Sequence, residues 1–110
     1  MELHVVFFQQ KYKDMKEATL HLDGLCVMAF FFEIGEPNPA YAEMSELLTS
    51  IVKPKTKASF TQPLALQDYM LSNLHEYYVY NGSLTTPPCH EVVTWLDFYD
   101  PITISHDQVN

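Results

Sequence analysis

Two residues near the start of the chain have the types and spacing of a metal ligand and its carboxylate partner. Glu2 and His4 stand two positions apart in the segment 2–8, and residues two apart on an extended strand point to the same face. When one ring nitrogen of a histidine binds a metal, the other carries a hydrogen. A carboxylate at this position can accept a hydrogen bond from that second nitrogen. On an isolated strand the same pair is typical of a solvated polar face, so its chemistry depends on the rest of the chain.

The remaining reactive side chains form no metal site by spacing. Cys26 and Cys89 are too far apart in sequence for a zinc knuckle or a redox Cys-x-x-Cys pair. Thr85 and Thr86 precede two prolines, a pattern that by itself predicts only a turn. We expect surface or packing roles for the other histidines, which are His21, His75, His90 and His106.

The composition excludes several classes of function. The 110 residues include 14 acidic residues, six lysines and no arginine, for a formal charge of −8. This charge argues against nucleic-acid binding and against docking on an anionic membrane surface. No apolar stretch reaches the roughly 18 to 20 residues of a transmembrane segment, and the first residues show no signal peptide. With 47% hydrophobic residues, a folded domain is expected.

The hydrophobic pattern predicts a mostly β (α+β) fold. Alternation over 2–8 predicts a strand with Glu2, His4 and Val6 on one face. The unbroken apolar run Leu25–Phe32 predicts a strand buried on both faces. Further strands are expected at 75–80, 91–98 and 101–105.

One amphipathic helix is predicted near 39–52. Asn38 is a suitable cap and Pro39 a suitable first helical residue. Apolar residues then recur at three- and four-residue spacing, and Lys53-Pro54 ends the pattern. Residues 64–74 fit either a loop or a short helix.

Three segments together resemble the α-class carbonic anhydrases. Residues 80–95, YNGSLTTPPCHEVVTW, are similar to that family's signature Y-x-G-S-L-T-T-P-P-C-x-x-x-V-x-W. Residues 2–6 resemble its E-L-H-x-V strand, and residues 23–39, DGLCVMAFFFEIGEPNP, its D-G-L-A-V-L-G-x-F-x-x-x-G-x-x-N-P segment. The resemblance runs over essentially the whole chain and implies part of that family's central twisted β-sheet.

The resemblance implies a zinc-dependent reversible hydration of carbon dioxide to bicarbonate, with sulfonamide-type inhibitors. His4 matches the third zinc ligand and Glu2 its carboxylate partner. Thr85 matches the catalytic threonine that accepts a hydrogen bond from zinc-bound hydroxide, and Thr86 the residue that touches bicarbonate. The apolar wall of the carbon dioxide pocket matches Val6, Val27, Leu84, Val93 and Trp95.

The same resemblance implies an incomplete domain over 1–110, lacking the N-terminal half and the C-terminal end. Family members carry two further zinc histidines in an upstream H-x-H strand, and this sequence contains no H-x-H. With one of three zinc ligands, we expect the isolated chain to be inactive. We also expect self-association through exposed apolar strand edges such as Leu25–Phe32. The alternative interpretation is a non-catalytic relative that serves as an interaction or structural protein.

Two features bear on the compartment. Cys89 resembles a cysteine of secreted and membrane-anchored family members, where it bonds a cysteine near the start of the domain. Asn81-Gly82-Ser83 is an N-glycosylation sequon, although a tight turn is an adequate explanation for Asn-Gly. We therefore expect an extracellular or secretory-pathway location for the parent protein. A Cys26–Cys89 bond would need Cα atoms within about 7 Å, which sequence leaves open.

Overall fold

The computed structural model describes residues 1–109, which form two compact units. The first contains Met1–Phe31 and Asn73–Asp100, and the second contains Phe32–Ser72 and the residues from Pro101 onward.

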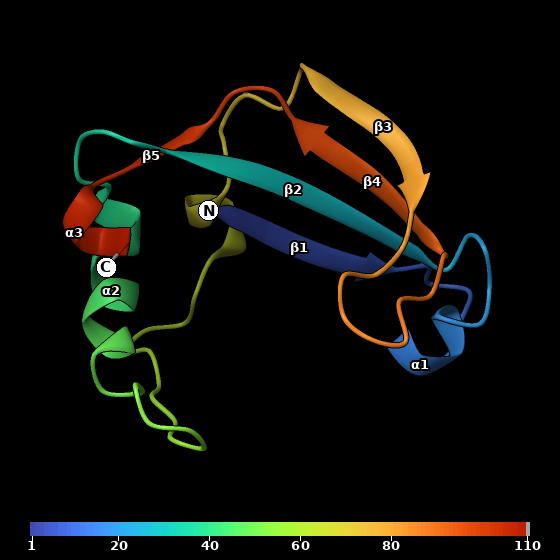
Figure 1. Cartoon of the computed structure of the whole chain (residues 1–110), viewed down its shortest axis with the longest axis horizontal. Coiled ribbons are helices and arrows are strands. Elements are labelled where there is room, and N and C mark those ends of the chain that lie inside the picture. The colour runs from blue at the N-terminus through green and yellow to red at the C-terminus, as the bar shows by residue number, and fades with distance from the viewer. Residues whose placement is uncertain (110) are drawn as a thin grey trace. The chain divides into compact units, whose positions relative to one another are not determined.

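The first unit is built on a β-sheet, as predicted, and the sheet contains both parallel and antiparallel pairs. Strand β1 (Glu2–Phe8) runs antiparallel to β2 (Leu25–Ile34), and β2 runs parallel to β4 (Val93–Phe98). Strand β3 (Tyr77–Gly82) pairs antiparallel with β4, so the order is β1-β2-β4-β3 (Figure 1). The expected edge at Leu25–Phe32 is wrong, because β2 is flanked by β1 and β4. The strands at the ends of this order are β1 and β3.

Both faces of β2 contribute to the core, as its unbroken apolar run predicted. On one face Val27 lies between Val6 of β1 and Trp95 of β4 in the pairing register. On the other face Phe30 stacks on Phe98, with ring centroids 4.8 Å apart. The main cluster of buried side chains lies on the first face and comprises Ala18, Leu25, Val27, Ala29, Val92, Val93 and Trp95.

A one-turn helix that the sequence analysis missed connects β1 to β2. In α1 (Met15–Ala18) the Asp14 carboxylate accepts a hydrogen bond from the backbone N–H of Glu17 at 2.8 Å. The Glu17 carboxylate in turn accepts from the backbone N–H of Lys13 at 2.9 Å. The bond to Asp14 satisfies one of the N–H groups that the start of a helix leaves without partners, and the bond from Lys13 ties the residue before the cap to the first turn. Gly24 then packs so closely that a Cβ would lie 1.7 Å from the carbonyl oxygen of Ala18.

The predicted tight turn at Asn81-Gly82 is wrong. Both residues belong to β3, where Asn81 pairs with Thr94 and Gly82 with Val93. None of the glycines in residues 1–109 has a positive φ, the conformation that such hairpin turns require. Gly82 is instead favoured by packing, because a Cβ there would lie 3.0 Å from Cδ1 of Trp95.

In the second unit the predicted helix begins as expected and ends early. The Asn38 side chain accepts from the Ala40 N–H, and a 3-10 helix (Pro39–Tyr41) leads into α2 (Ala42–Leu48). The hydroxyls of Thr49 and Ser50 each donate to a carbonyl three residues back at 2.7 Å. These bonds satisfy carbonyls at the helix end, so residues 49–52 leave the helix.

The other elements of the second unit are short. Strand β5 (Ile102–Ile104) pairs parallel with the end of β2, a second 3-10 helix spans Leu66–Tyr69, and α3 spans His106–Val109. Tyr41 is buried and donates its hydroxyl to the Tyr69 carbonyl at 2.5 Å. Burial, and then the neighbouring Tyr69, raise the pKa of Tyr41 to about 12. None of the described helices has the length and apolar character needed to cross a membrane.

Candidate metal and substrate site

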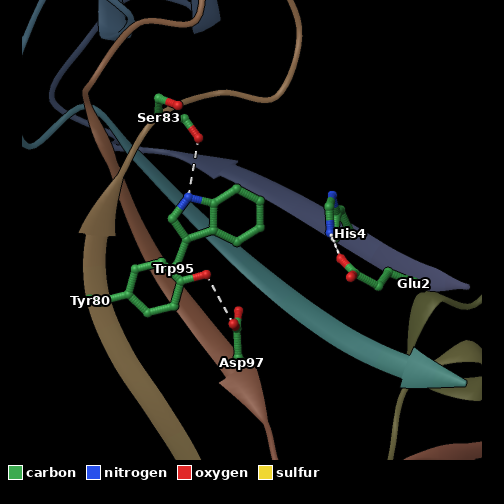
Figure 2. A network of polar contacts seen from close by, with 6 residues as sticks. All are labelled: Glu2, His4, Tyr80, Ser83, Trp95 and Asp97. Carbon is green, nitrogen blue, oxygen red and sulfur yellow. Dashed lines mark hydrogen bonds and ion pairs between the residues drawn. The ribbon is translucent and has the colours of Figure 1, made fainter.

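The predicted pair on β1 is joined by a hydrogen bond. Nε2 of His4 lies 2.8 Å from Oε2 of Glu2, and Figure 2 shows the other ring nitrogen at the far end of the imidazole. An ionised carboxylate only accepts, so Nε2 carries the hydrogen. In the neutral imidazole, Nδ1 is then the nitrogen with a lone pair for a metal.

Trp95 of β4 contacts the ring of His4 from across β2. The two rings meet edge to face, with centroids 5.0 Å apart and planes inclined by 73°. The indole N–H donates to the Ser83 carbonyl at 3.2 Å, and only 7% of Trp95 is exposed (Figure 2). The indole therefore has a fixed orientation beside the imidazole.

A second polar pair that the sequence analysis missed lies beside Trp95. The Tyr80 hydroxyl donates to Oδ2 of Asp97 at 2.9 Å, and the Tyr80 ring stacks on the indole (Figure 2). Oδ1 of Asp97 is buried without a hydrogen-bond partner among residues 1–109. Partial burial, followed by the bond to Asp97, raises the pKa of Tyr80. The alternation of side chains along each strand could have placed Tyr80 and Asp97 on one face of the sheet. Their contact, however, depends on the register between β3 and β4, which the sequence does not give.

These side chains open into a cavity of about 300 Å³, which we call the His4 cavity. Its lining comes from the β-sheet and from the loop after β3. The lining residues are Glu2, His4, Phe31, Tyr80, Gly82, Ser83, Thr85, Trp95 and Asp97. The structure thus brings four predicted site residues, Glu2, His4, Thr85 and Trp95, to one cavity.

The predicted apolar wall is only partly at that cavity, since Trp95 lines it and the other wall residues do not. Val27 and Val93 are buried in the same sheet face, and Leu84 packs against the core cluster. Val6 lies in register with Val27 and is 43% exposed. Thr86 is exposed, and its carbonyl accepts from the Cys89 N–H at 2.9 Å.

The donor set is smaller than a catalytic zinc site requires. Such sites use three protein ligands and an open position. No group of three or more His, Cys, Asp or Glu side chains within residues 1–109 could hold a metal ion. Cys26 and Cys89 are free thiols, and partial burial raises the pKa of Cys26. Residues 1–109 thus place the imidazole of His4 at the cavity, and no complete zinc site lies among them.

Comparison with known proteins agrees with the resemblance. The family model of the eukaryotic-type carbonic anhydrases matches residues 1–110. The chain is 36% identical to carbonic anhydrase 3 of Homo sapiens, over 98% of this chain and 41% of that protein. It is 38% identical to carbonic anhydrase 1 of Oryctolagus cuniculus, over 98% of this chain and 46% of that protein. Identity to carbonic anhydrase 6 of Homo sapiens is 39%, over 99% of this chain and 36% of that protein.

The chain thus spans less than half the length of these relatives, and the match extends along essentially all of it. Its sheet, its Glu-x-His strand and its Thr-Thr-Pro-Pro loop all lie inside the matched region. This chain belongs to the eukaryotic-type carbonic anhydrase family.

Proposed function

We propose that the protein takes part in the zinc-dependent, reversible hydration of carbon dioxide to bicarbonate, with His4 as one zinc ligand through Nδ1. The supporting observation is the bond from Nε2 of His4 to Glu2 at the cavity that Thr85 also lines. In this class of reaction the metal supplies a nucleophile at neutral pH by lowering the pKa of water.

We expect the residues of this chain to orient the zinc-binding imidazole and the attacking oxygen, and not to react with the substrate themselves. Glu2 selects the tautomer of His4, and Trp95 packs against the ring and limits its rotation. The Thr85 hydroxyl can both accept and donate a hydrogen bond, so it would align the attacking oxygen with the substrate carbon. Carbon dioxide is apolar, and the proposed substrate contact at the His4 cavity is Trp95. The contacts that the resemblance implies at Val6, Val27, Leu84, Thr86 and Val93 stay predictions, since these residues do not line that cavity.

We further propose that residues 1–110 form an incomplete catalytic domain and are inactive alone. Catalytic zinc needs three protein ligands, and His4 is one. The other two would have to come from polypeptide outside residues 1–110. Stopped-flow hydration of carbon dioxide by the 110-residue chain, with and without added zinc, tests this. We expect the chain with zinc to hydrate carbon dioxide no faster than zinc alone. Sulfonamide-sensitive turnover well above the rate of zinc alone would show that the chain is active by itself.

A chimera tests the catalytic role itself. In it this chain replaces the aligned segment of the Oryctolagus cuniculus carbonic anhydrase 1, which it matches at 38% identity. We expect zinc binding and sulfonamide-sensitive hydration, a large loss of zinc in His4→Ala, and a roughly 10- to 100-fold loss of metal affinity or activity in Glu2→Gln. His90→Ala, at a histidine away from the His4 cavity, is the matched control and should change neither.

The non-catalytic alternative makes a different prediction for the same chimera. An interaction or structural protein has no need of Thr85 or of an oriented His4. A folded, zinc-loaded chimera without hydration activity would favour that alternative and contradict the catalytic proposal.

We infer a secretory-pathway or extracellular location for the parent protein. The support is the resemblance of Cys89 to the cysteine of secreted and membrane-anchored members, together with its exposed thiol. Fractionation of cells that express the natural protein tests this, and recovery only from the cytosol would contradict it.

A further inference from the structure

Asn81 begins an N-glycosylation sequon that the proposed function does not use. It lies within a strand, where asparagine has no evident structural role. Asn81-Gly82-Ser83 is the only Asn-x-Ser/Thr sequence in the 110 residues, and its middle residue is not proline. The competing explanation of Asn-Gly was a tight turn, and the structure removes it, because both residues pair within β3.

The structure explains Gly82 but not Asn81. Gly82 is favoured because a Cβ would lie only 3.0 to 3.1 Å from the Trp95 indole. Asn81 is exposed, and its side chain makes no hydrogen bond to any described residue. Asn is disfavoured in strands, so packing and pairing give no reason for an asparagine here.

The surroundings of Asn81 are accessible. It lies near the end of β3, which has β4 as its only partner in the described sheet, and an irregular segment follows. An open surface hollow of about 370 Å³ is lined by Asn81, Gly82, Ser83 and Glu91. Alternation along β3 places Asn81 on the face opposite Tyr80 and Gly82, which line the His4 cavity.

We propose that Asn81 is an N-glycosylation site. The acceptor is its side-chain nitrogen Nδ2, and the donor class is a lipid-linked oligosaccharide diphosphate. A bond forms between Nδ2 and the anomeric carbon while the bond from that carbon to the diphosphate oxygen breaks. The amide gives up one proton, and the diphosphate leaves with the electron pair of the broken bond. A glycan here would project from the face opposite the His4 cavity.

The test is secretion of the full 110-residue chain behind a cleavable signal peptide from a eukaryotic host. Intact mass is measured before and after treatment with a peptide N-glycosidase. We expect one N-glycan, whose enzymatic removal converts residue 81 to aspartate. Asn81→Gln and Ser83→Ala should both abolish it, whereas Ser83→Thr retains the sequon and should keep it. Asn73→Gln, at an asparagine outside any sequon, should leave the glycan in place.

A variant with a sequon at another position serves as a positive control, so that the absence of a glycan on Asn81 can be interpreted. Pro54→Asn, combined with Asn81→Gln, creates an Asn-Lys-Thr sequence in an exposed loop of the second unit. The host is one in which this variant is glycosylated, which shows that the chain reaches the modifying enzyme. An unmodified Asn81 in that host would overturn the proposal. A glycan that persists in Asn81→Gln would also overturn it.

Discussion

His4 of β1 and Trp95 of β4 meet edge to face across β2, with ring centroids 5.0 Å apart and planes inclined by 73°. The same indole donates to the Ser83 carbonyl, so one side chain supports both the imidazole and the loop that carries Thr85. We expect Trp95→Ala to cost about 3 to 5 kcal/mol in the free energy of unfolding. Trp95→Phe should cost less, though at least the roughly 1 kcal/mol of a lost hydrogen bond.

Urea unfolding of the chain measures both changes. The matched control is Tyr99→Ala, at an aromatic residue of the same unit that is 62% exposed, and it should change stability by no more than about 0.5 kcal/mol. Equal effects of Trp95→Ala and Tyr99→Ala would contradict the role given to the indole.

Glycine-to-alanine substitutions should separate backbone collisions from side-chain collisions. At Gly24 the new Cβ would lie 1.7 Å from the backbone oxygen of Ala18, and at Gly35 it would lie 2.5 Å from the Thr103 Cγ2 methyl. A methyl group can move away, whereas the Ala18 carbonyl is fixed by α1. We expect Gly24→Ala to reach or exceed the upper end of the about 1 to 3 kcal/mol that overpacking costs. Gly35→Ala should cost clearly less, and the reverse order of unfolding midpoints would refute this account.

Acid should weaken the connection between β1 and β2 through Asp23. The hydrogen bond from Lys11, and then that from Tyr12, lower the pKa of Asp23 from its ordinary 3.8 to about 2. Because the folded pKa lies below the unfolded one, this stabilisation is present above about pH 4 and disappears as the pH falls toward about 2. Carboxyl-carbon NMR during a pH titration of the folded chain measures the pKa directly.

Lys11→Met should raise the pKa of Asp23 in the folded chain toward its ordinary value. The folded and unfolded pKa values of Asp23 would then differ less, so Asp23 would contribute less to the loss of stability in acid. Lys13→Met removes the same charge from an exposed lysine whose side chain makes no ion pair among residues 1–109, and should leave that pKa in place. The explanation fails if Asp23 titrates near 3.8 in the unmodified chain.

The end strands of the sheet predict self-association of the isolated chain. Strand β1 lies at one end of the sheet order, and its Phe7 and Phe8 are each 44% exposed. Unpaired strand edges with apolar side chains pair readily with other chains. Phe7→Lys should shift sedimentation toward monomer, whereas Val52→Lys, at an exposed loop residue, should not. A monomer at all concentrations in analytical ultracentrifugation, with a cooperative melt, would contradict this prediction.

Strand positions followed from local patterns, whereas turns and helix ends did not. The alternation of residues 2–8 and the apolar run at 25–32 carry their own periodicity, so β1 and β2 could be predicted. The role of Gly82 depends on Trp95, thirteen residues away and on another strand, so local turn preference gave the wrong answer. The end of α2 depends on two hydroxyl groups that bond back to the helix, and apolar spacing does not record such bonds.

Some residues of the candidate site could likewise be predicted from local sequence, whereas others depend on how the strands pair. Glu2 and His4 are two residues apart on one strand, so their spacing placed the side chains within reach of each other, and the family motif indicated the bond. Tyr80 and Asp97 were missed because their contact depends on the register between β3 and β4. Thr85 could be assigned only through the motif around it, since an isolated threonine before two prolines indicates no chemistry.

The bond between Glu2 and His4 also bears on the order in which the site forms during folding. It closes a loop of only two residues, so its entropic cost is small and it can form as soon as the first strand is extended. The contact between His4 and Trp95 instead joins residues from opposite ends of the sequence and must wait for the sheet to assemble. The tautomer of the imidazole is therefore set by a local event, and its final orientation by a late, long-range one.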